Sequence, residues 1–535
     1  MTEPANGARE GLLYSLLDDP LISYRHAEDG RRLKASLPEL FVAMANDEVR
    51  DFPALRPHQR HPWHAFLCQV AAIALHQADQ TELLPTADAW RQALLAVTPN
   101  DLDGAAWCLI SPLDRPAVLQ APVPGGGVTD WKTVCRAADE LDMLVTSKNH
   151  DIKAARLRDA DPEQWLLALL SLQTQEGYLG AGNYGISRMN KGWASRPGVG
   201  VAAAGGWGLR WQRDVATLLR ERDGIAVDYG LAETEGHALV WLLPWDGTTS
   251  LSFKQLDPLY VEVCRRVRIR CHEAGLCAFS TTTKAPRIAG EERNGKTGDP
   301  WTPIDMVSGK ALTITLGGFH YKRVAELLFG GEFIPSATQH ANVGDAKTRL
   351  YFIAQGIARG KGETNGYHER RVPISPKLRR LLTGQRDQAA RISSERIVAI
   401  GEVRKLLWLS LMTLFNGGST ANDASDGTKN KAGEFTRPFE LREDARFFVD
   451  LTAEVESDDA HAARLNWLIG LVARAEETLK RAFDAGPRNG MQRYRAQAAA
   501  LSRFHGVLSG VKSPLPMLAQ HYQDSRKSNQ EETQA

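Results

Sequence analysis

Apolar side chains in the first part of the chain recur at the spacing of amphipathic helices. In the clearest case Phe66, Val70 and Ile73 share one face of a predicted helix. Helix-start signals agree with the pattern, because Ser36 to Glu39 has the spacing of a capping box and an Asp-Pro pair at 161–162 precedes another apolar run. The pattern predicts helices over residues 36–45, 62–78, 165–173 and 209–222.

The middle of the chain, from 236 to 375, changes to a strand pattern. Residues 260–271 (YVEVCRRVRIRC) alternate apolar and basic side chains, as expected of a strand with one face in water. Residues 349–374 resemble a long hairpin, and residues 12–25 predict a short strand pair around an Asp-Asp-Pro turn. We therefore expect an α+β protein whose strands are concentrated in this middle region.

Beyond 376 the helical period returns. Leu465, Leu468 and Val472 form the apolar stripe of a bundle helix, and the apolar run 406–415 is too short to cross a bilayer and predicts a buried helix. The polar segment 416–434 predicts a connection between bundle helices. From about residue 524 apolar side chains almost vanish, which predicts a disordered tail. The predicted domains are 1–375, mixed α/β, and 376–535, helical.

Composition narrows the class of protein. A chain of 535 residues favours two or three domains, and 43% hydrophobic with 24% charged residues is typical of a globular protein. A net charge of +1 argues against a freestanding, non-specific nucleic-acid binder, but it is compatible with a subunit whose partners supply positive surface. The six cysteines are mostly far apart and no secretory signal pattern is visible, which favours a reducing cytoplasm.

The segment from Gly182 to Arg213 stands out. It holds eight glycines, five Lys/Arg and three tryptophans without a single carboxylate. Glycine lets a backbone approach a ligand closely, and Arg188, Lys191 and Arg196 would add positive charge suited to phosphates. The same composition also fits a glycine-rich turn between core elements, with its bases in solvent.

Catalytic signatures are weak. His58, His61 and His64 have a spacing at which a metal could bind, or they could satisfy polar groups at a helix start. Cys264, Cys271 and Cys277 lack the paired spacing of a zinc ribbon and fit ordinary thiols better. Phosphate-loop, nucleophile-elbow and metalloprotease motifs are absent, which favours a binding or scaffolding subunit over an enzyme.

The order of several segments resembles the CasA family, the large subunit of the type I-E CRISPR surveillance complex Cascade. The matching segments, in order, are LLDDPLISYR, SLPELFVAMAND, RPHQRHPWHAFLCQVAAIAL, PAVLQAP, LDMLVTSKNHDIK, NYGISRMNKGW, FGGEFIPSATQ and ARFFVDL. This resemblance implies an irregular α/β N-terminal domain and a C-terminal four-helix bundle, without catalysis, cofactor or metal. It also implies that the protein finds the short protospacer-adjacent motif, the PAM, in double-stranded DNA and starts strand separation, so that guide RNA can pair with the target.

The resemblance assigns roles to four groups of residues. A glycine loop in the minor groove corresponds to Asn183, Tyr184, Gly185, Ser187, Arg188, Asn190 and Lys191. A lysine finger corresponds to Lys284 or, as second candidate, Lys296. A wedge that unstacks the first target pair corresponds to Phe333, Ile334, Pro335, Ser336 and Gln339, a more apolar tip than the Asn/Gln-rich one of the family. A loop that anchors the subunit near the guide RNA and other Cascade subunits corresponds to Asn149, His150, Ile152 and Lys153.

The resemblance also implies that the C-terminal bundle contacts small subunits and helps recruit the effector helicase-nuclease. Two further hypotheses remain from the residues alone. One is a metal-dependent nuclease that uses His58, His61 and His64; the other is a protein-only scaffold that does not touch DNA.

Overall fold

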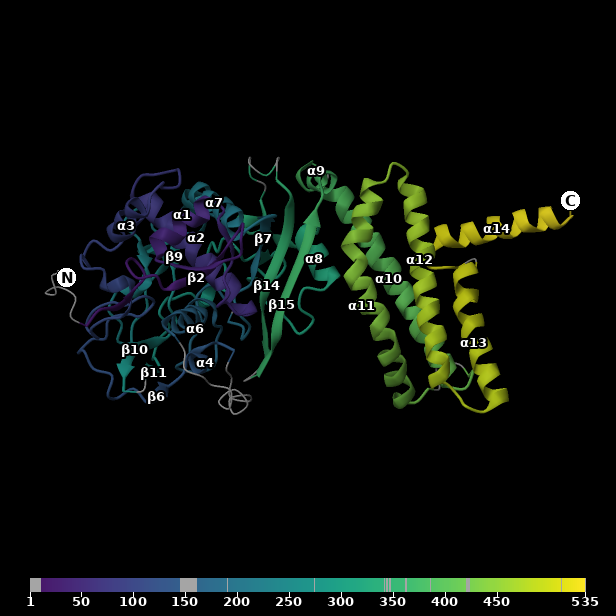
Figure 1. Cartoon of the computed structure of the whole chain (residues 1–535). Coiled ribbons are helices and arrows are strands. Elements are labelled where there is room, and N and C mark those ends of the chain that lie inside the picture. The colour runs from purple at the N-terminus through teal and green to yellow at the C-terminus, as the bar shows by residue number, and fades with distance from the viewer. Residues whose placement is uncertain are drawn as a thin grey trace. The chain divides into compact units, whose positions relative to one another are not determined.

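The computed structural model describes residues 11–144, 161–189, 191–273, 275–340, 342, 345, 348–360, 363–384, 386–419, 424–510 and 512–534. The chain forms two compact units (Figure 1). The first unit comprises residues 1–319 and 331–373, and the second comprises 320–330 and 374–535.

The first unit mixes helices with several small sheets. Its helices are α1 (Leu37–Ala45), α2 (Arg60–Gln77), α3 (Ala87–Ala96), α4 (Ala138–Leu141), α6 (Pro162–Gln175) and α7 (Trp207–Tyr229). Its strands are β1 (Leu13–Ser15), β2 (Ile22–His26), β3 (Arg32–Ala35), β4 (Val49–Asp51), β5 (Cys108–Ile110), β6 (Thr133–Cys135), β7 (Gly198–Ala203), β8 (His237–Leu239), β9 (Leu256–Val261), β10 (Arg266–His272), β11 (Gly275–Thr281), β12 (Ile304–Asp305), β13 (Phe333–Ile334), β14 (Leu350–Gly360) and β15 (Glu363–Ile374). They pair in the orders β3–β2–β4, β10–β11–β6, β15–β14–β7, β1–β5, β8–β9 and β12–β13.

Helix α2 is the centre of this unit. Every side chain from His61 to Leu75 is buried, so the helix is enclosed on all sides and not on the single face that the apolar spacing predicted. It packs against α3, α6, α7 and β9. Trp211 of α7 stacks on Phe41 at 5.4 Å and donates from its indole nitrogen to the carbonyl oxygen of Leu67 (3.2 Å).

Local signals predicted helix starts well. The capping box between Ser36 and Glu39 is formed at α1, and Asp161 caps α6 by accepting from the amide of Gln164 (3.0 Å). Two strand predictions are corrected by tertiary contacts. The predicted strand 260–271 is interrupted, because the Gln173 side chain accepts from the amides at 264 and 265 (3.0 and 2.8 Å). In addition, β1 pairs with β5 and not with β2.

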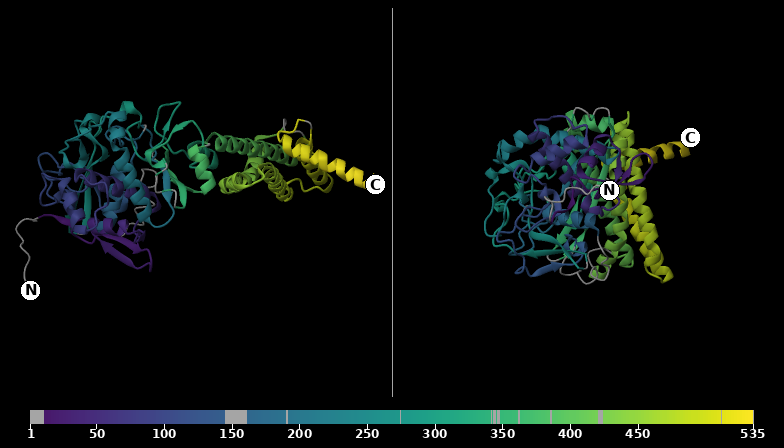
Figure 2. Two further views of the ribbon diagram at one scale, coloured as in Figure 1. Left: turned by 90° about the horizontal axis from the view of Figure 1, so that it is seen from above. Right: turned by 60° about the vertical axis from the view of Figure 1, so that its left-hand side comes forward.

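The second unit is helical, as predicted. It contains α8 (Tyr321–Leu328), α9 (Pro376–Gly384), α10 (Arg386–Phe415), α11 (Asp426–Glu456), α12 (Ala460–Arg481), α13 (Gly490–Ser509) and α14 (Pro516–Gln534). Helix α10 packs against α11, α12 and α13, and these four long helices form the bundle (Figure 2). The α+β fold class with a C-terminal four-helix bundle is therefore confirmed.

Two predictions for this unit are corrected. Helix α11 begins at Asp426, inside the predicted polar connection, because Ser425 caps it by accepting from the amide of Thr428 (3.3 Å). Residues 524–534, predicted to be disordered, continue α14 (Pro516–Gln534), and this stretch of the sequence is rich in Gln, Glu, Lys and Arg, which favour helix. Among the described residues, we find no helix with the length and apolarity needed to cross a bilayer.

Candidate nucleic-acid interface

Glycines hold the predicted DNA-binding loop against neighbouring main chain. The loop lies between α6 and β7. A Cβ on Gly185 would lie 2.5 Å from the carbonyl carbon of Gly177 and 2.7 Å from the amide nitrogen of Tyr178. A Cβ on Gly177 would lie 2.3 Å from the carbonyl oxygen of Gly192. These glycines therefore allow two stretches of backbone to pack closely against each other. The sequence analysis had instead expected the missing side chains to let a ligand approach the backbone.

The second half of the loop, Ile186 to Met189, faces the interior. Arg188 is 1% exposed; its guanidinium lies 4.0 Å above the ring centroid of Tyr260 and donates to the Tyr260 carbonyl oxygen (2.8 Å). Ser187 donates from its amide and its hydroxyl to the two carboxylate oxygens of Glu262 (2.6 and 2.9 Å). The surface position predicted for Ser187 and Arg188 is therefore corrected, because both side chains are occupied by interior contacts.

Asp299 is the buried counter-ion that faces Arg196 and Arg188. Its carboxylate accepts from Nε and Nη2 of Arg196 (2.5 and 2.6 Å), and Nη1 of Arg188 lies 3.9 Å away. Burial alone would raise the pKa of Asp299, but the two guanidinium groups outweigh burial and hold that pKa well below its usual range. Burial raises the pKa of the nearby Glu262 to about 7. Arg196 is 2% exposed, so its predicted contribution to surface charge is also corrected.

The first half of the loop reaches solvent. Asn183, Tyr184 and Gly185 are half-buried, and the Lys191 side chain is 49% exposed, at a positive φ of 67°. The rings of Tyr184 and Tyr178 lie 6.2 Å apart and line a pocket of about 320 Å³ together with Lys191. Asn190 lies outside the described residues. The accessible part of the predicted loop is thus Asn183 to Gly185 with Lys191.

Both lysine-finger candidates adjoin this loop. The Tyr184 hydroxyl donates to the carbonyl oxygen of Lys284 (3.2 Å), and the Lys284 side chain is exposed. Lys296 is also exposed and follows Gly295, where an added Cβ would lie 2.9 Å from the carbonyl oxygen of Arg188. Lys284 therefore lies beside the accessible half of the loop, and Lys296 lies beside the buried half.

The predicted wedge residues form a compact turn. Phe333 is 4% exposed on β13, which pairs with β12, and Ser336 is also 4% exposed. The side-chain oxygen of Gln339 accepts from the Ser336 amide (3.0 Å) and hydroxyl (3.2 Å). The Gln339 amide group is therefore used in a capping box at the start of the short helix Ala337–Gln339. Pro335 is half-buried, and Ile334 is 42% exposed. The predicted projection of Phe333 and Ser336 is therefore corrected.

An exposed apolar turn lies next to this segment. Met306 and Val307, directly after β12, are 59% and 92% exposed. The Met306 amide donates to the carbonyl oxygen of Glu332 (2.8 Å), which places the turn beside the start of β13. The sequence interpretation missed this pair, although the apolar dipeptide within DMVSGK was a visible signal. Met306, Val307 and Ile334, the exposed apolar side chains in and beside the paired strands β12 and β13, are called the apolar tip below.

The predicted guide-anchoring residues Asn149, His150, Ile152 and Lys153 lie outside the described residues. Tyr178 was also missed, because the segment singled out in the sequence began at Gly182, although the acid-free run extends back to Gly177 and includes Tyr178. Aromatic rings that flank a basic loop are a recognised signal of nucleic-acid contact.

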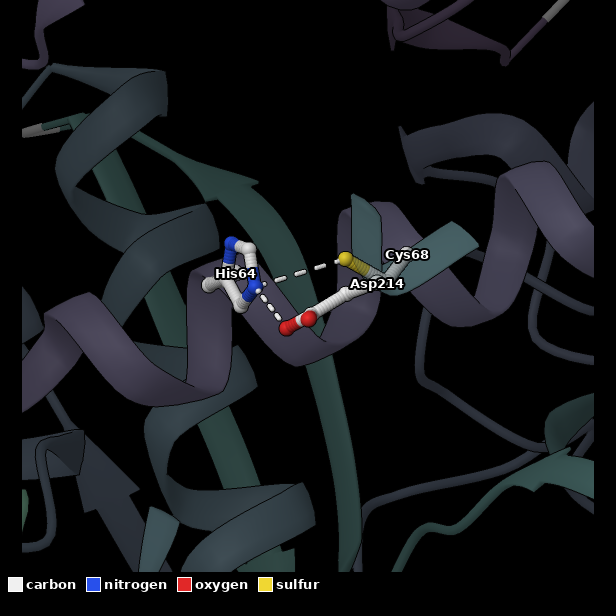
Figure 3. Close-up of side chains that lie close together, drawn as sticks. All are labelled: His64, Cys68 and Asp214. Carbon is white, nitrogen blue, oxygen red and sulfur yellow. Dashed lines mark hydrogen bonds and ion pairs between the residues drawn. The ribbon is translucent and has the colours of Figure 1, made fainter. Parts of the chain in front are cut away.

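The three histidines of α2 and the turn before it have separate environments. His58 Nε2 lies 2.8 and 3.0 Å from the carboxylate oxygens of Asp142. His64 Nε2 lies 2.8 Å from a carboxylate oxygen of Asp214 and 3.5 Å from Cys68 Sγ (Figure 3). Neither ring nitrogen of His61 has a hydrogen-bond partner among the described residues. The alternative interpretation of His58, His61 and His64 as one metal site is therefore not supported, because no such cluster forms among the described residues.

His64, Cys68 and Asp214 are close enough to one another to hold a metal ion. His64 and Cys68 lie one helical turn apart on α2, and Asp214 faces them from α7. All three side chains are buried, with relative exposure of 0%, 0% and 2%. Burial lowers the pKa of His64 to about 4, so the neutral imidazole donates to Asp214, and burial raises the pKa of the Cys68 thiol. No DNA phosphate could reach this cluster.

The cysteines of the middle region are free thiols. Cys264 and Cys277 are buried and Cys271 is exposed. On the β10–β11 ladder Cys271 pairs with Leu276, and Cys277 pairs with Arg270. They form no cluster of metal ligands with other described residues.

No family model matches the chain, and no curated protein matches it. Solved structures do share its fold. The CRISPR-associated protein Cse1 from Acidimicrobium ferrooxidans has a TM-score of 0.62 at 14% identity, over 95% of this chain and 98% of that one. CasA of Thermus thermophilus has 0.62 at 15%, over 92% and 98%. Cse1 of Thermobifida fusca has 0.63 at 14%, over 94% and 98%. The chain thus has the Cse1/CasA fold over nearly its whole length, which confirms the fold that the resemblance implied.

Proposed function

We propose that this chain is the non-catalytic large subunit of a type I-E RNA-guided surveillance complex. In this role it recognises the PAM in double-stranded DNA and begins strand separation. The observation that carries the proposal is the Cse1/CasA fold, which extends over 95% of the chain in the Acidimicrobium comparison and includes both units. Guide RNA and other Cascade subunits are the partners, and the C-terminal bundle contacts small subunits and the effector helicase-nuclease. No cofactor is required.

The accessible half of the glycine loop fits a DNA groove. Asn183 offers an amide, Tyr184 an aromatic ring, and Lys191 and Lys284 two cations, within one neighbourhood of the surface. Cations bind phosphates, whereas an amide or backbone group reads the degenerate edge of the minor groove. Recognition therefore uses this half of the loop, and the buried Arg188 holds its base in place.

Replacing both Lys191 and Lys284 with alanine is expected to weaken binding of target duplex by the assembled complex about tenfold or more at low salt. Each lost phosphate contact should reduce the slope of log K against log[salt] by about 0.9. Binding is measured by electrophoretic mobility shift at several salt concentrations, with target duplexes that carry or lack the PAM.

The matched control is Lys34→Ala, an exposed lysine on β3 of the same unit. This variant should leave both affinity and slope unchanged. If the double variant binds like the unsubstituted complex, the interface is elsewhere and the scaffold hypothesis gains support.

The apolar tip formed by Met306, Val307 and Ile334 is the proposed wedge. Apolar side chains that enter a base step oppose restacking, and unstacking costs a few kcal/mol per step. Of these three residues only Ile334 was assigned from the sequence; the other two are the most exposed.

Replacing Met306 and Val307 with serine is expected to slow opening of the first target base pairs about tenfold while initial duplex binding is retained. A fluorescent base analogue beside the PAM measures the opening rate in a stopped-flow experiment. Val227→Ser, an equally apolar surface position at 70% exposure on α7, is the control. Equal opening rates for the two variants would exclude this turn as the wedge.

A further inference from the structure

The N-terminal end of α7 borders a strongly cationic pocket in the first unit, separate from the glycine-loop surface. The pocket has a volume of about 530 Å³, within the usual range for small-molecule sites. Five arginines line it against two carboxylates, Asp51 and Glu369, which leaves a surplus of three positive charges. Such a surplus in a concave site favours an anionic occupant.

Most of these arginines already have partners. Arg25 pairs with Asp51 (3.1 Å), and Arg371 and Arg60 share Glu369 (2.7 and 3.5 Å). These pairs fix the rim of the pocket and use up its two carboxylates.

Arg210, in the first turn of α7, is different. It is only 7% exposed, yet its guanidinium makes no hydrogen bond or ion pair with any described residue. None of its nitrogens is among the buried polar atoms sealed from solvent, so they face the pocket that Arg210 lines. Burying nine-tenths of a guanidinium group without a hydrogen-bond or ion-pair partner costs free energy. A bound anion that pairs with the group would offset this cost.

The surroundings of Arg210 also favour an anionic ligand. The first turn of α7 carries no acidic residue, and its cap is Gly206, which has no side chain to cap the helix. Asp47 accepts from the Leu209 amide (3.1 Å), so one amide of the turn is already taken. Asp214, one turn further along α7, attracts Arg210 without a hydrogen bond between them. The positive end of the helix dipole adds to the charge of Arg210.

Aromatic side chains complete the wall. Trp207 packs edge-on against Phe52 at 4.8 Å, and Arg371 lies 5.3 Å over the ring of Tyr351. All four residues line the pocket. These side chains offer a surface for the planar base of a nucleotide, whose phosphates would then reach Arg210.

We propose that this pocket binds a phosphate-bearing small molecule, with Arg210 as the phosphate ligand at its base. The phosphate belongs either to a nucleotide or to inorganic polyphosphate. Arginine is suited to this role because its planar fork binds two phosphate oxygens at once.

Isothermal titration calorimetry of the full chain with ATP and with inorganic tripolyphosphate tests the proposal. At least one probe is expected to bind saturably below about 1 mM. Tighter binding of ATP would identify a nucleotide as the source of the phosphate, and equal or tighter binding of tripolyphosphate would identify the inorganic anion.

Arg210→Gln is expected to weaken the bound probe about tenfold or more, and Arg210→Lys less so, because it keeps the charge but loses the fork. If Arg210→Gln is poorly folded, Arg50→Gln at the exposed rim should still weaken binding several-fold. Arg220→Gln, a 46% exposed arginine on the same helix, should change nothing. Absence of saturable binding, binding unaffected by the changes at Arg210 and Arg50, or binding of an oligonucleotide without either probe would overturn the proposal.

Discussion

Replacing Asp299 with asparagine is expected to lower the free energy of unfolding by about 3–5 kcal/mol. The substitution keeps the shape of the side chain but removes the charge that faces Arg196 at 2.5–2.6 Å and Arg188 at 3.9 Å. Two buried guanidinium groups would then lack their counter-ion, and the desolvation cost of each would no longer be offset. Urea unfolding followed by tryptophan fluorescence measures the loss, since Trp301, whose backbone amide donates to Asp299 (3.1 Å), is buried in the folded protein.

Asp223→Asn is the matched control for this experiment. Asp223 also pairs with an arginine, Arg222, at 3.2 Å, but its side chain is 91% exposed. Because water screens that pair, the change should cost less than about 1 kcal/mol. A similar cost for the two variants would mean that Asp299 is not a buried counter-ion for the glycine loop.

Replacing Gly185 with alanine is expected to destabilise the first unit by about 3 kcal/mol and to weaken target-duplex binding about tenfold. The new Cβ would lie 2.5 Å from the carbonyl carbon of Gly177 and 2.7 Å from the amide nitrogen of Tyr178. Backbone atoms cannot move aside as a flexible side chain can. The loop must therefore shift, and Tyr184 shifts with it.

Gly224→Ala separates this clash from a general effect of adding a methyl group. Gly224 lies within α7 with no atom within 4 Å of an added Cβ. Alanine there should raise stability by about 0.5–1 kcal/mol, because glycine is the poorer helix former. Chemical denaturation and mobility-shift binding of both variants check the pair. If Gly185→Ala keeps full stability and full binding, the loop is not held by close backbone packing.

The helices of this protein were the most predictable part, because their signals are local. The capping box at Ser36 and the Asp-Pro helix start at 161–162 are both formed. In each case the two bonded residues are fewer than four positions apart in the sequence. Strand pairing was less predictable. The interruption of the predicted strand 260–271 depends on Gln173, some ninety residues earlier, and no pattern within the strand could reveal it.

The candidate interface was only half predictable. Composition singled out the loop, and the resemblance proposed Lys284, whose carbonyl oxygen accepts from the Tyr184 hydroxyl. Composition could not separate the accessible Lys191 from the buried Arg188, since both are basic residues of the same acid-free, glycine-rich stretch. The expected projection of Phe333 was wrong for a similar reason, because Phe333 is buried while Val307, from a segment 26 positions earlier, is exposed.

The amino-acid sequence by itself determined the α+β class, the helical C-terminal unit and the position of the glycine-rich loop, because periodicity, capping and glycine content act over a few residues. Only the tertiary structure decided which loop residues face water. That outcome depends on two residues that are distant in sequence: Glu262, which accepts hydrogen bonds from Ser187, and Asp299, which supplies the buried negative charge beside Arg188 and Arg196. Whether a charged side chain can be buried depends on its ion-pair partner. A partner that is distant in the sequence comes near only when the chain is folded.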